Sequence, residues 1–350
     1  MDTLQEIDET FNSPEYIAQS LHDFKNKNWN GKRFPDLVNY FRSTFKAVPF
    51  HLINIKKGTV LFRGRKNDQF KYPIFNNLEE ISIRSDDKVD TFGRANIPKQ
   101  SVFYCSTDEV SVVREVTQWY VNDTGRAQDL HTKGTVDMSW SPFTCMMTIS
   151  AWVVNEDLQL ALLFSSMDKQ RSLEIQKCAK ERLTIGPEGS EANNKSSNLI
   201  VDFFSNEFAK NDVKHHLEYI YSAYYAFEVF HEHGLNNQGT KYDGVQYVSV
   251  ANDYNGENIA LSRNALEKKI QFLGANFCCT FNSYEKKLDG DKNAIIGRDK
   301  AAKIRSDNTF EWIDHAGGFD YLTKSGDQFK HIMLPSDGSK FSKDMVRITG

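Results

Sequence analysis

The sequence predicts an α+β fold, because segments with helical periodicity and segments with strand periodicity follow one another without regular alternation. Residues 1–50 carry apolar side chains at helical spacing, and short strand-like runs separated by polar turns come after them. The chain has 350 residues, of which 39% are hydrophobic and 13% aromatic, so it can bury a large core. This composition excludes a disordered or fibrous protein.

Two helices are predicted in the first 50 residues. One begins after Ser13, an N-cap residue that precedes a proline and a glutamate, and the other covers residues 35–47. Tyr16, Ile17, Leu21 and Phe24 recur at helical spacing in the first, and Leu37, Tyr40, Phe41 and Phe45 lie on one face of the second. We interpret residues 1–50 as an N-terminal helical extension.

Strands and helices then follow in mixed order. Thr107, Asp108 and Glu109 are expected to cap a helix that extends to about Tyr120. Strands are expected around Val60 and Phe62, around Ile81 and Ile83, and over 101–106, 242–250 and 258–262, with two more in 143–164 on either side of a turn at 155–157. Helices are expected at 168–180 and 198–233, a loop at 186–194, and a solvated basic helix face at 297–305.

Charge and targeting signals restrict the class of protein. The 43 basic and 47 acidic residues give 43 − 47 = −4, so the overall charge does not favour a nucleic-acid partner. The acidic N-terminus has no apolar signal region, and the most apolar window, 143–154, is too short to cross a membrane. Five scattered cysteines without a CxxC pair give no support for a disulfide scaffold or structural zinc. We expect a cytoplasmic protein.

Three segments place polar side chains in apolar surroundings. The first is Leu-Phe-Arg-Gly-Arg at 61–65, at the end of a predicted strand. The second runs from Gly-Arg-Ala-Asn at 93–96 through Phe-Tyr-Cys-Ser at 103–106 to Glu115, which lies two helical turns after the cap among three valines. The third is Tyr-Asp-Gly-Val-Gln-Tyr-Val-Ser-Val at 242–250, where strand alternation puts Ser249 on the same face as Tyr247. Each segment alone also fits a solvated arginine or a satisfied core hydroxyl.

In this order, the blocks resemble the RES domain, which is named for its arginine, glutamate and serine. The resemblance covers roughly residues 59–263 and implies a fold similar to that of ADP-ribosylating toxins, with NAD as the substrate. It implies a catalytic domain at 51–265 with an enlarged insertion at about 120–240, and a C-terminal α+β tail at 266–350 packed on that domain. The compact members of the family lack these additions.

The resemblance also assigns roles to individual residues. It makes Arg63 the motif arginine, with Arg65 as a rival, and Glu115 and Ser249 the motif acid and serine. Arg94 becomes the second basic residue and Tyr104 the aromatic residue of the pocket. Many RES proteins are bacterial toxins paired with an antitoxin, so an antitoxin or immunity protein is the implied partner, and the cytoplasm is that of the bacterium or of a target cell.

These residue types suit the cleavage of NAD. Arginine forks bind pyrophosphate oxygens, and a carboxylate stabilises the positive charge that the ribose develops as nicotinamide leaves. Tyr104 is expected to stack on nicotinamide, and Ser249 to hydrogen-bond the base or the ribose. The sequence leaves the acceptor open: water (a glycohydrolase), phosphate (a phosphorylase), or a protein or nucleic acid (an ADP-ribosyltransferase). A module that senses NAD without cleaving it is a further alternative.

No cofactor or metal is expected. The histidine pairs at 215–216 and 231–233 lie about four turns apart if they share one helix, so they cannot share an ion there. The oligomeric state does not follow from the sequence.

Overall fold

The computed structural model confirms the α+β class. It describes residues 12–29, 34–45, 49, 51–67, 74–121, 143–163, 191–210, 213–231, 242–251, 256–282, 293–314, 319–325 and 328–334. The chain forms two compact units, each made of three segments. The first unit comprises Met1–Thr59, Ile83–Thr107 and Val154–Gln271, and the second comprises Val60–Ser82, Asp108–Val153 and Phe272–Gly350.

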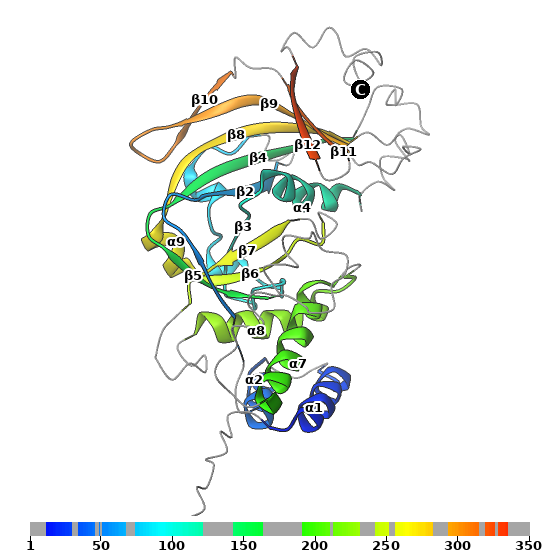
Figure 1. Cartoon of the computed structure of the whole chain (residues 1–350). Coiled ribbons are helices and arrows are strands. Elements are labelled where there is room, and N and C mark those ends of the chain that lie inside the picture. The colour runs from blue at the N-terminus through cyan, green and yellow to red at the C-terminus, as the bar shows by residue number, and fades with distance from the viewer. Residues whose placement is uncertain are drawn as a thin grey trace, which may run out of the picture. The chain divides into compact units, whose positions relative to one another are not determined.

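The first unit contains a five-stranded mixed sheet (Figure 1). Its strands β5 and β6 pair in parallel, and the other neighbours pair antiparallel. In spatial order the strands are β1 (His51–Ile55), β5 (Leu158–Leu162), β6 (Gly244–Val248), β7 (Glu257–Leu261) and β3 (Phe103–Cys105). All five residues of β6 are buried, as expected for a central strand that is covered on both faces.

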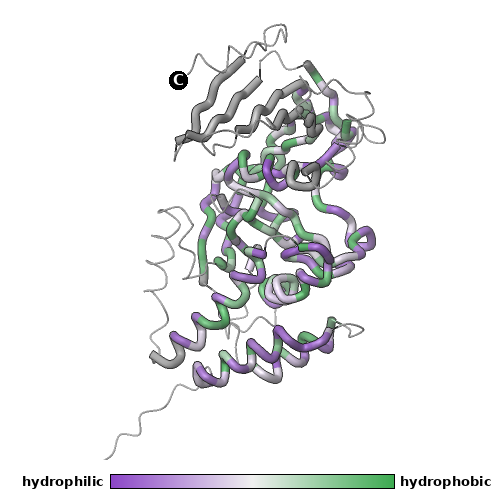
Figure 2. The backbone as a smooth tube through the Cα atoms, turned by 90° about the vertical axis from the view of Figure 1, so that its right-hand side faces the viewer, coloured by the Kyte–Doolittle hydropathy of each residue, from purple (hydrophilic) through white to green (hydrophobic). Residues whose placement is uncertain are grey.

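Helices cover one face of this sheet. They are α1 (Pro14–Asn26), α2 (Phe34–Thr44), α7 (Glu191–Phe208) and α8 (Ile220–Phe230), and the unit also holds α9 (Arg263–Lys269) and the short 3-10 helices η1 (Asp86–Lys88) and η2 (His216–Tyr219). Along the longer helices the backbone alternates between hydrophilic and hydrophobic residues, as one-sided burial requires (Figure 2). Ala161, Val245 and Ala260 of the sheet belong to the same apolar cluster as these helices.

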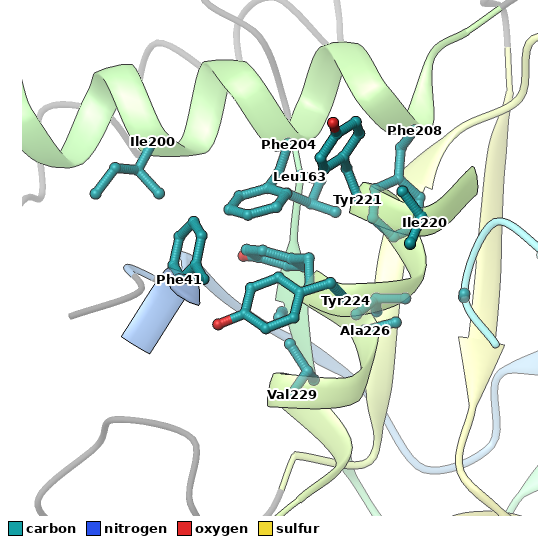
Figure 3. Packing of buried hydrophobic residues seen from close by; sticks show 14 of the residues in the cluster. Phe41, Leu163, Ile200, Phe204, Phe208, Ile220, Tyr221, Tyr224, Ala226 and Val229 are labelled. Atoms are coloured by element: carbon teal, nitrogen blue, oxygen red, sulfur yellow. The ribbon is translucent and has the colours of Figure 1, made fainter. Parts of the chain in front are cut away.

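Aromatic side chains from distant segments build that cluster. Phe24 of α1 lies 5.2 Å from Phe41 of α2 and 4.9 Å from Tyr221 of α8, measured between ring centroids. Figure 3 shows Phe41 of α2 and Phe204 of α7 directed towards Tyr224 of α8, at centroid distances of 4.7 and 6.1 Å from it. The N-terminal helices therefore share one core with α7 and α8.

Within the residues that the structure describes, the second unit contains a seven-stranded sheet and two helices. The sheet has the order β12 (Gln328–Leu334), β11 (Phe319–Ser325), β9 (Asn293–Ile304), β8 (Ile270–Asn282), β4 (Phe143–Val154) and β2 (Val60–Lys66), with β10 (Phe310–Asp314) paired to β9. The helices are α3 (Leu78–Ile81) and α4 (Glu109–Val121). A small cluster of Val113, Val116, Met147, Ile149 and Cys278, with Phe62 packed against it, joins α4 to the sheet.

Most predicted elements are confirmed. Ser13 caps α1 by accepting a hydrogen bond from the amide of Tyr16, and Asp108 accepts bonds from the amides of Val110 and Ser111 at the start of α4. The strands predicted in 143–164 are β4 and β5, and those at 242–250 and 258–262 are β6 and β7. The helix predicted at 168–180 lies outside the described residues.

Three expectations are wrong in detail. Ile81 ends the short helix α3, because Asn77 and Glu80 form a reciprocal capping box that outweighs the alternation with Ile83. The helix expected at 198–233 is two helices, since α7 starts at Glu191, within the predicted loop, and ends at Phe208. The basic stretch 297–305 belongs mainly to β9, whose ladders with β8, β10 and β11 supply hydrogen bonds that outweigh helical propensity.

An ion pair between Arg42, which is partly exposed, and a buried glutamate fixes α2 to α8. The Nε and Nη2 atoms of Arg42 each donate to a different carboxylate oxygen of Glu228 at 3.0 Å, and the Glu228 side chain is 0% exposed. The hydrogen bond to Glu228 raises the pKa of the Arg42 guanidinium above its ordinary value. A fork-to-fork pair of this kind is strong when it is intact and costly when one partner is missing.

We therefore expect Arg42→Leu to lower the free energy of unfolding by about 3 kcal/mol, because it leaves the Glu228 carboxylate buried without its partner. Urea denaturation followed by circular dichroism measures the change. The double variant with Glu228→Leu should recover most of the loss. Arg305, whose pair with Glu311 is exposed, serves as the control, and Arg305→Leu should leave stability nearly unchanged. Equal losses for both single variants would contradict this assignment.

Three tyrosines in the same core predict loss of stability in alkali. Burial raises the pKa of Tyr221 to about 12, and burial also raises the pKa of Tyr224 and Tyr225 above the ordinary value. The neutral phenols stabilise the folded chain fully below the unfolded pKa of about 10, and that stabilisation is lost as the pH rises from there through the folded values. The free energy of unfolding should fall from pH 10 to 12, and the absorbance of tyrosinate should appear as the chain unfolds. Full ionisation of these tyrosines in a chain that is still folded at pH 11 would refute this.

Candidate functional site

Tyr104 holds the Gly-Arg-Ala-Asn turn in place. Its hydroxyl accepts a hydrogen bond from the amide of Ala95 and donates one to Oδ1 of Asn96, both at 2.9 Å. Gly93 and Asn96 also bridge through their backbones, with the Gly93 amide 3.0 Å from the Asn96 carbonyl. A Cβ atom on Gly93 would lie 2.3 Å from Asn96 Oδ1, so a side chain at this position would displace the Asn96 amide. Two parts of the second predicted segment, 93–96 and 103–106, are therefore one local structure.

Arg94 extends from this turn to the end of α7. Its Nη1 and Nη2 atoms donate to the carbonyls of Phe208 and Lys210 at 2.6 and 2.9 Å, and its guanidinium carbon lies 5.2 Å from the ring centre of Tyr219. The last carbonyls of a helix have no partners within the helix and carry partial negative charge. Arg94 supplies hydrogen-bond donors and positive charge to these carbonyls at the end of α7.

Arg63 and Arg65 donate hydrogen bonds to carbonyls at the C-terminal end of α3. Arg63, which is 6% exposed, donates from Nε to the Ile81 carbonyl and from Nη2 to the Ser82 carbonyl, both at 3.1 Å. Arg65 donates from Nε and Nη2 to the Glu80 carbonyl at 3.2 and 2.8 Å. Both arginines therefore fix the C-terminal end of α3 to β2. The structure gives both arginines main-chain carbonyls as acceptors, so both candidates for the motif arginine lie at the end of α3.

Gly64, between these arginines, permits close contact between β2 and α4. A Cβ atom at this position would lie 2.6 Å from Cγ2 of Val116 and 2.7 Å from Cγ1 of Val112. Successive strand residues point to opposite faces, so Arg63 and Arg65 leave β2 on the face away from α4. The first predicted block and the helix that carries Glu115 are thus direct neighbours in the second unit.

Glu115 lies in the middle of α4 and is half-buried. Val112, Val113 and Val116 around it are buried, which agrees with the expectation that this carboxylate lies near the core. The cap at Asp108 is firm, because its Oδ2 accepts bonds from both the amide and the hydroxyl of Ser111, at 2.9 and 2.7 Å.

Ser249 directly follows β6 and is completely buried. Its amide donates to the Gly256 carbonyl at 2.7 Å, which extends the β6–β7 pairing past Val248. Since β7 also pairs with β3, the third predicted block is only one strand removed from Tyr104. Arg94, Tyr104 and Ser249 belong to the first unit, whereas Arg63, Arg65 and Glu115 belong to the second.

The sequence reasoning missed the part that Asp243 plays in the third block. Its Oδ2 accepts hydrogen bonds from the Gln159 amide and from Nζ of Lys269, both at 2.8 Å, and its side chain is almost fully buried. One carboxylate thus joins β5, the start of β6 and the end of α9. An acidic residue next to glycine at a strand start is the only sequence signal for this role.

The histidines have structural contacts in the described part of the chain. His215 caps η2 by accepting a hydrogen bond from the Leu217 amide, and the ring of His216 stacks on Phe92 at 6.2 Å. No cluster of three or more histidine, cysteine or acidic residues suited to a metal occurs within the described ranges. None of the helices described above is long and apolar enough to cross a membrane.

Comparison with models of known protein families gives no match, and neither does comparison with curated proteins. The RES resemblance accordingly depends on the content and order of the sequence blocks.

The contact at Gly64 makes a prediction about stability. We expect Gly64→Ala to lower the free energy of unfolding by about 1 to 3 kcal/mol, because the new methyl group forces α4 away from β2. The matched control is Gly274→Ala in β8 of the same unit, where a Cβ atom meets nothing within 4 Å. Thermal unfolding of both variants measures the difference. Equal midpoints for the two would show that the β2–α4 contact tolerates a side chain.

Proposed function

We propose that this chain is a RES-type enzyme that cleaves the bond between nicotinamide and ribose in NAD, releasing ADP-ribose to water or to phosphate. The proposal includes an ADP-ribosyltransferase-like core and action in the cytoplasm as a toxin or defence effector that depletes NAD. The observation that supports it best is spatial. The three sequence segments, which span almost 200 residues, group into two local structures: β2 with α4, and the Gly93–Asn96 turn with β3, β7 and β6.

Glu115 is the proposed catalytic carboxylate. As nicotinamide leaves with the bonding electron pair, the ribose becomes an oxocarbenium ion, and a nearby carboxylate stabilises its charge. Water or phosphate then bonds to the anomeric carbon, and water releases a proton as it does so. The half-buried position of Glu115 on a well-capped helix supports this role, because a carboxylate acts more strongly on a developing charge when less solvent surrounds it.

Arg63 and Arg94 are the proposed contacts to the pyrophosphate. Each also donates to two main-chain carbonyls, but a guanidinium has five N–H donors, so carbonyl and phosphate contacts are compatible. The carbonyl contacts restrict the side-chain conformations, and a restricted arginine loses less entropy when it binds an anion.

Tyr104 is the proposed aromatic contact to nicotinamide. Because its hydroxyl binds Ala95 and Asn96, the ring has a fixed orientation, which favours stacking on a flat base. Ser249 supplies the hydroxyl that orients the base or the ribose.

The direct test follows nicotinamide release from NAD by chromatography, with and without phosphate. We expect Glu115→Gln to reduce the rate by about a hundredfold or more while the fold is retained, since it removes the charge but not the shape of the side chain. Glu109→Gln, on the first turn of the same helix, is the matched control and should keep most of the activity.

The products decide between the alternatives. Free ADP-ribose indicates hydrolysis, and a phosphorylated product that appears only in phosphate indicates phosphorolysis. Label on a protein or nucleic acid identifies an ADP-ribosyltransferase. NAD that binds without any release would refute cleavage and favour a sensor, and a folded Glu115→Gln variant with full activity would remove Glu115 from the mechanism.

A further inference from the structure

Three contacts restrain the guanidinium of Arg94. Its Nη1 and Nη2 atoms donate to the carbonyls of Phe208 and Lys210 at 2.6 and 2.9 Å. Its central carbon also lies over the ring of Tyr219, 5.2 Å from the ring centre, which is within the range of the attraction between a cation and an aromatic ring. Two carbonyls and one aromatic ring of the same unit therefore act on one charged group.

The ring contact restricts a motion that the two hydrogen bonds allow. Hydrogen bonds from two nitrogens fix one edge of a planar guanidinium, but the plane can still turn about the line that joins those nitrogens. A third contact limits this turn, and with it the direction of the other N–H donors. The orientation in which Arg94 meets an anion thus depends on the ring of Tyr219.

Tyr219 is itself held by contacts that do not involve the guanidinium. It is the last residue of η2, which begins with a capping box. In this box the Leu217 amide donates to Nδ1 of His215 at 3.3 Å, and the His215 amide donates to Oε1 of Glu218 at 2.9 Å. The carbonyl of Tyr219 accepts a hydrogen bond from the hydroxyl of Ser222 in α8 at 3.1 Å. The ring therefore extends from an anchored part of the backbone.

We propose that Tyr219 is a positioning residue that orients the Arg94 guanidinium for the pyrophosphate of NAD. The place of Arg94 at the pyrophosphate rests on the proposed function, whereas the restraint rests on the contacts above. An arginine that already has its binding orientation loses less entropy when an anion binds, so the ring contributes to affinity without touching the substrate. Bond cleavage depends on Glu115 in the proposed function, so loss of the ring should weaken binding and leave the chemical step unchanged.

The restraint is tested first without a ligand. The Nε–H group of Arg94 is followed by NMR in the full chain, and its signal is identified by its disappearance in Arg94→Lys. We expect Tyr219→Leu to lower the order parameter of this group into the flexible range, below about 0.6, because leucine has no ring to attract the cation. Tyr219→Phe should leave the order parameter unchanged, because phenylalanine keeps the ring.

The consequence for binding is tested with ADP-ribose, which carries the pyrophosphate but lacks the bond to nicotinamide. Isothermal titration calorimetry should show an affinity about threefold to tenfold lower for Tyr219→Leu and unchanged for Tyr219→Phe. In the turnover of NAD, Tyr219→Leu should raise KM by a similar factor and leave kcat unchanged.

Tyr40 gives the matched control, because its ring also lies beside a cation in the first unit. Nζ of Lys27 is 3.6 Å from the centre of this ring, and the ring stacks on Phe24 at 5.9 Å. Tyr40→Leu should therefore lower the thermal midpoint but leave the affinity for ADP-ribose unchanged. An equal loss of affinity in Tyr40→Leu and Tyr219→Leu would indicate a general loss of structure and would overturn the proposal.

The outcomes separate this inference from the proposed function. If Arg94 keeps its order in Tyr219→Leu, or if the affinity for ADP-ribose does not change, the positioning role is overturned, even where the protein cleaves NAD. If ADP-ribose does not bind to the unmodified protein, the link to pyrophosphate is overturned. If order and affinity both fall in Tyr219→Leu but the unmodified protein does not cleave NAD, the proposed enzyme fails and the positioning role of Tyr219 stands.

Discussion

The unpaired carbonyls at the ends of two helices are the constraint on which the candidate site depends. A helix that ends inside a protein must find donors for its last carbonyl groups, and here arginines from neighbouring segments supply them. Arg63 and Arg65 bind the end of α3, and Arg94 binds the end of α7. These contacts set the position of β2 and of the Gly93–Asn96 turn. The arginines that are candidates for substrate binding therefore also hold the fold together.

A second constraint is the charge buried in the helical layer. Glu207 and Glu228 are at most 1% exposed, and their partners include Lys25 of α1 and Arg42 of α2. Because a buried carboxylate without a counter-charge is costly, the N-terminal helices complete the electrostatics of this unit as well as its aromatic packing. The helices α1 and α2, which the sequence analysis interpreted as an N-terminal extension, contribute side chains to the same apolar core as α7 and α8.

The sequence predicted the fold class and most elements because local signals determine them. Ser13, Asp108 and the alternation in 242–250 act over a few residues, so pattern reasoning finds them. Pairing partners are not local. The strands predicted on either side of the turn at 155–157 belong to different sheets, since β5 pairs with β1 and β6 whereas β4 pairs with β2. Arg94 binds a carbonyl 114 positions away, and no short-range pattern encodes such a contact.

The alternation of the two units along the chain has a consequence for synthesis and engineering. Each unit is made of three segments, and the last segment of the first unit ends at Gln271. During synthesis on the ribosome, neither unit can complete its sheet until most of the chain has emerged. The early segments therefore lack the later strands with which they pair. For the same reason, no single truncation releases one unit intact. Insertion or circular permutation within a surface turn, rather than dissection, is the means of probing either unit separately.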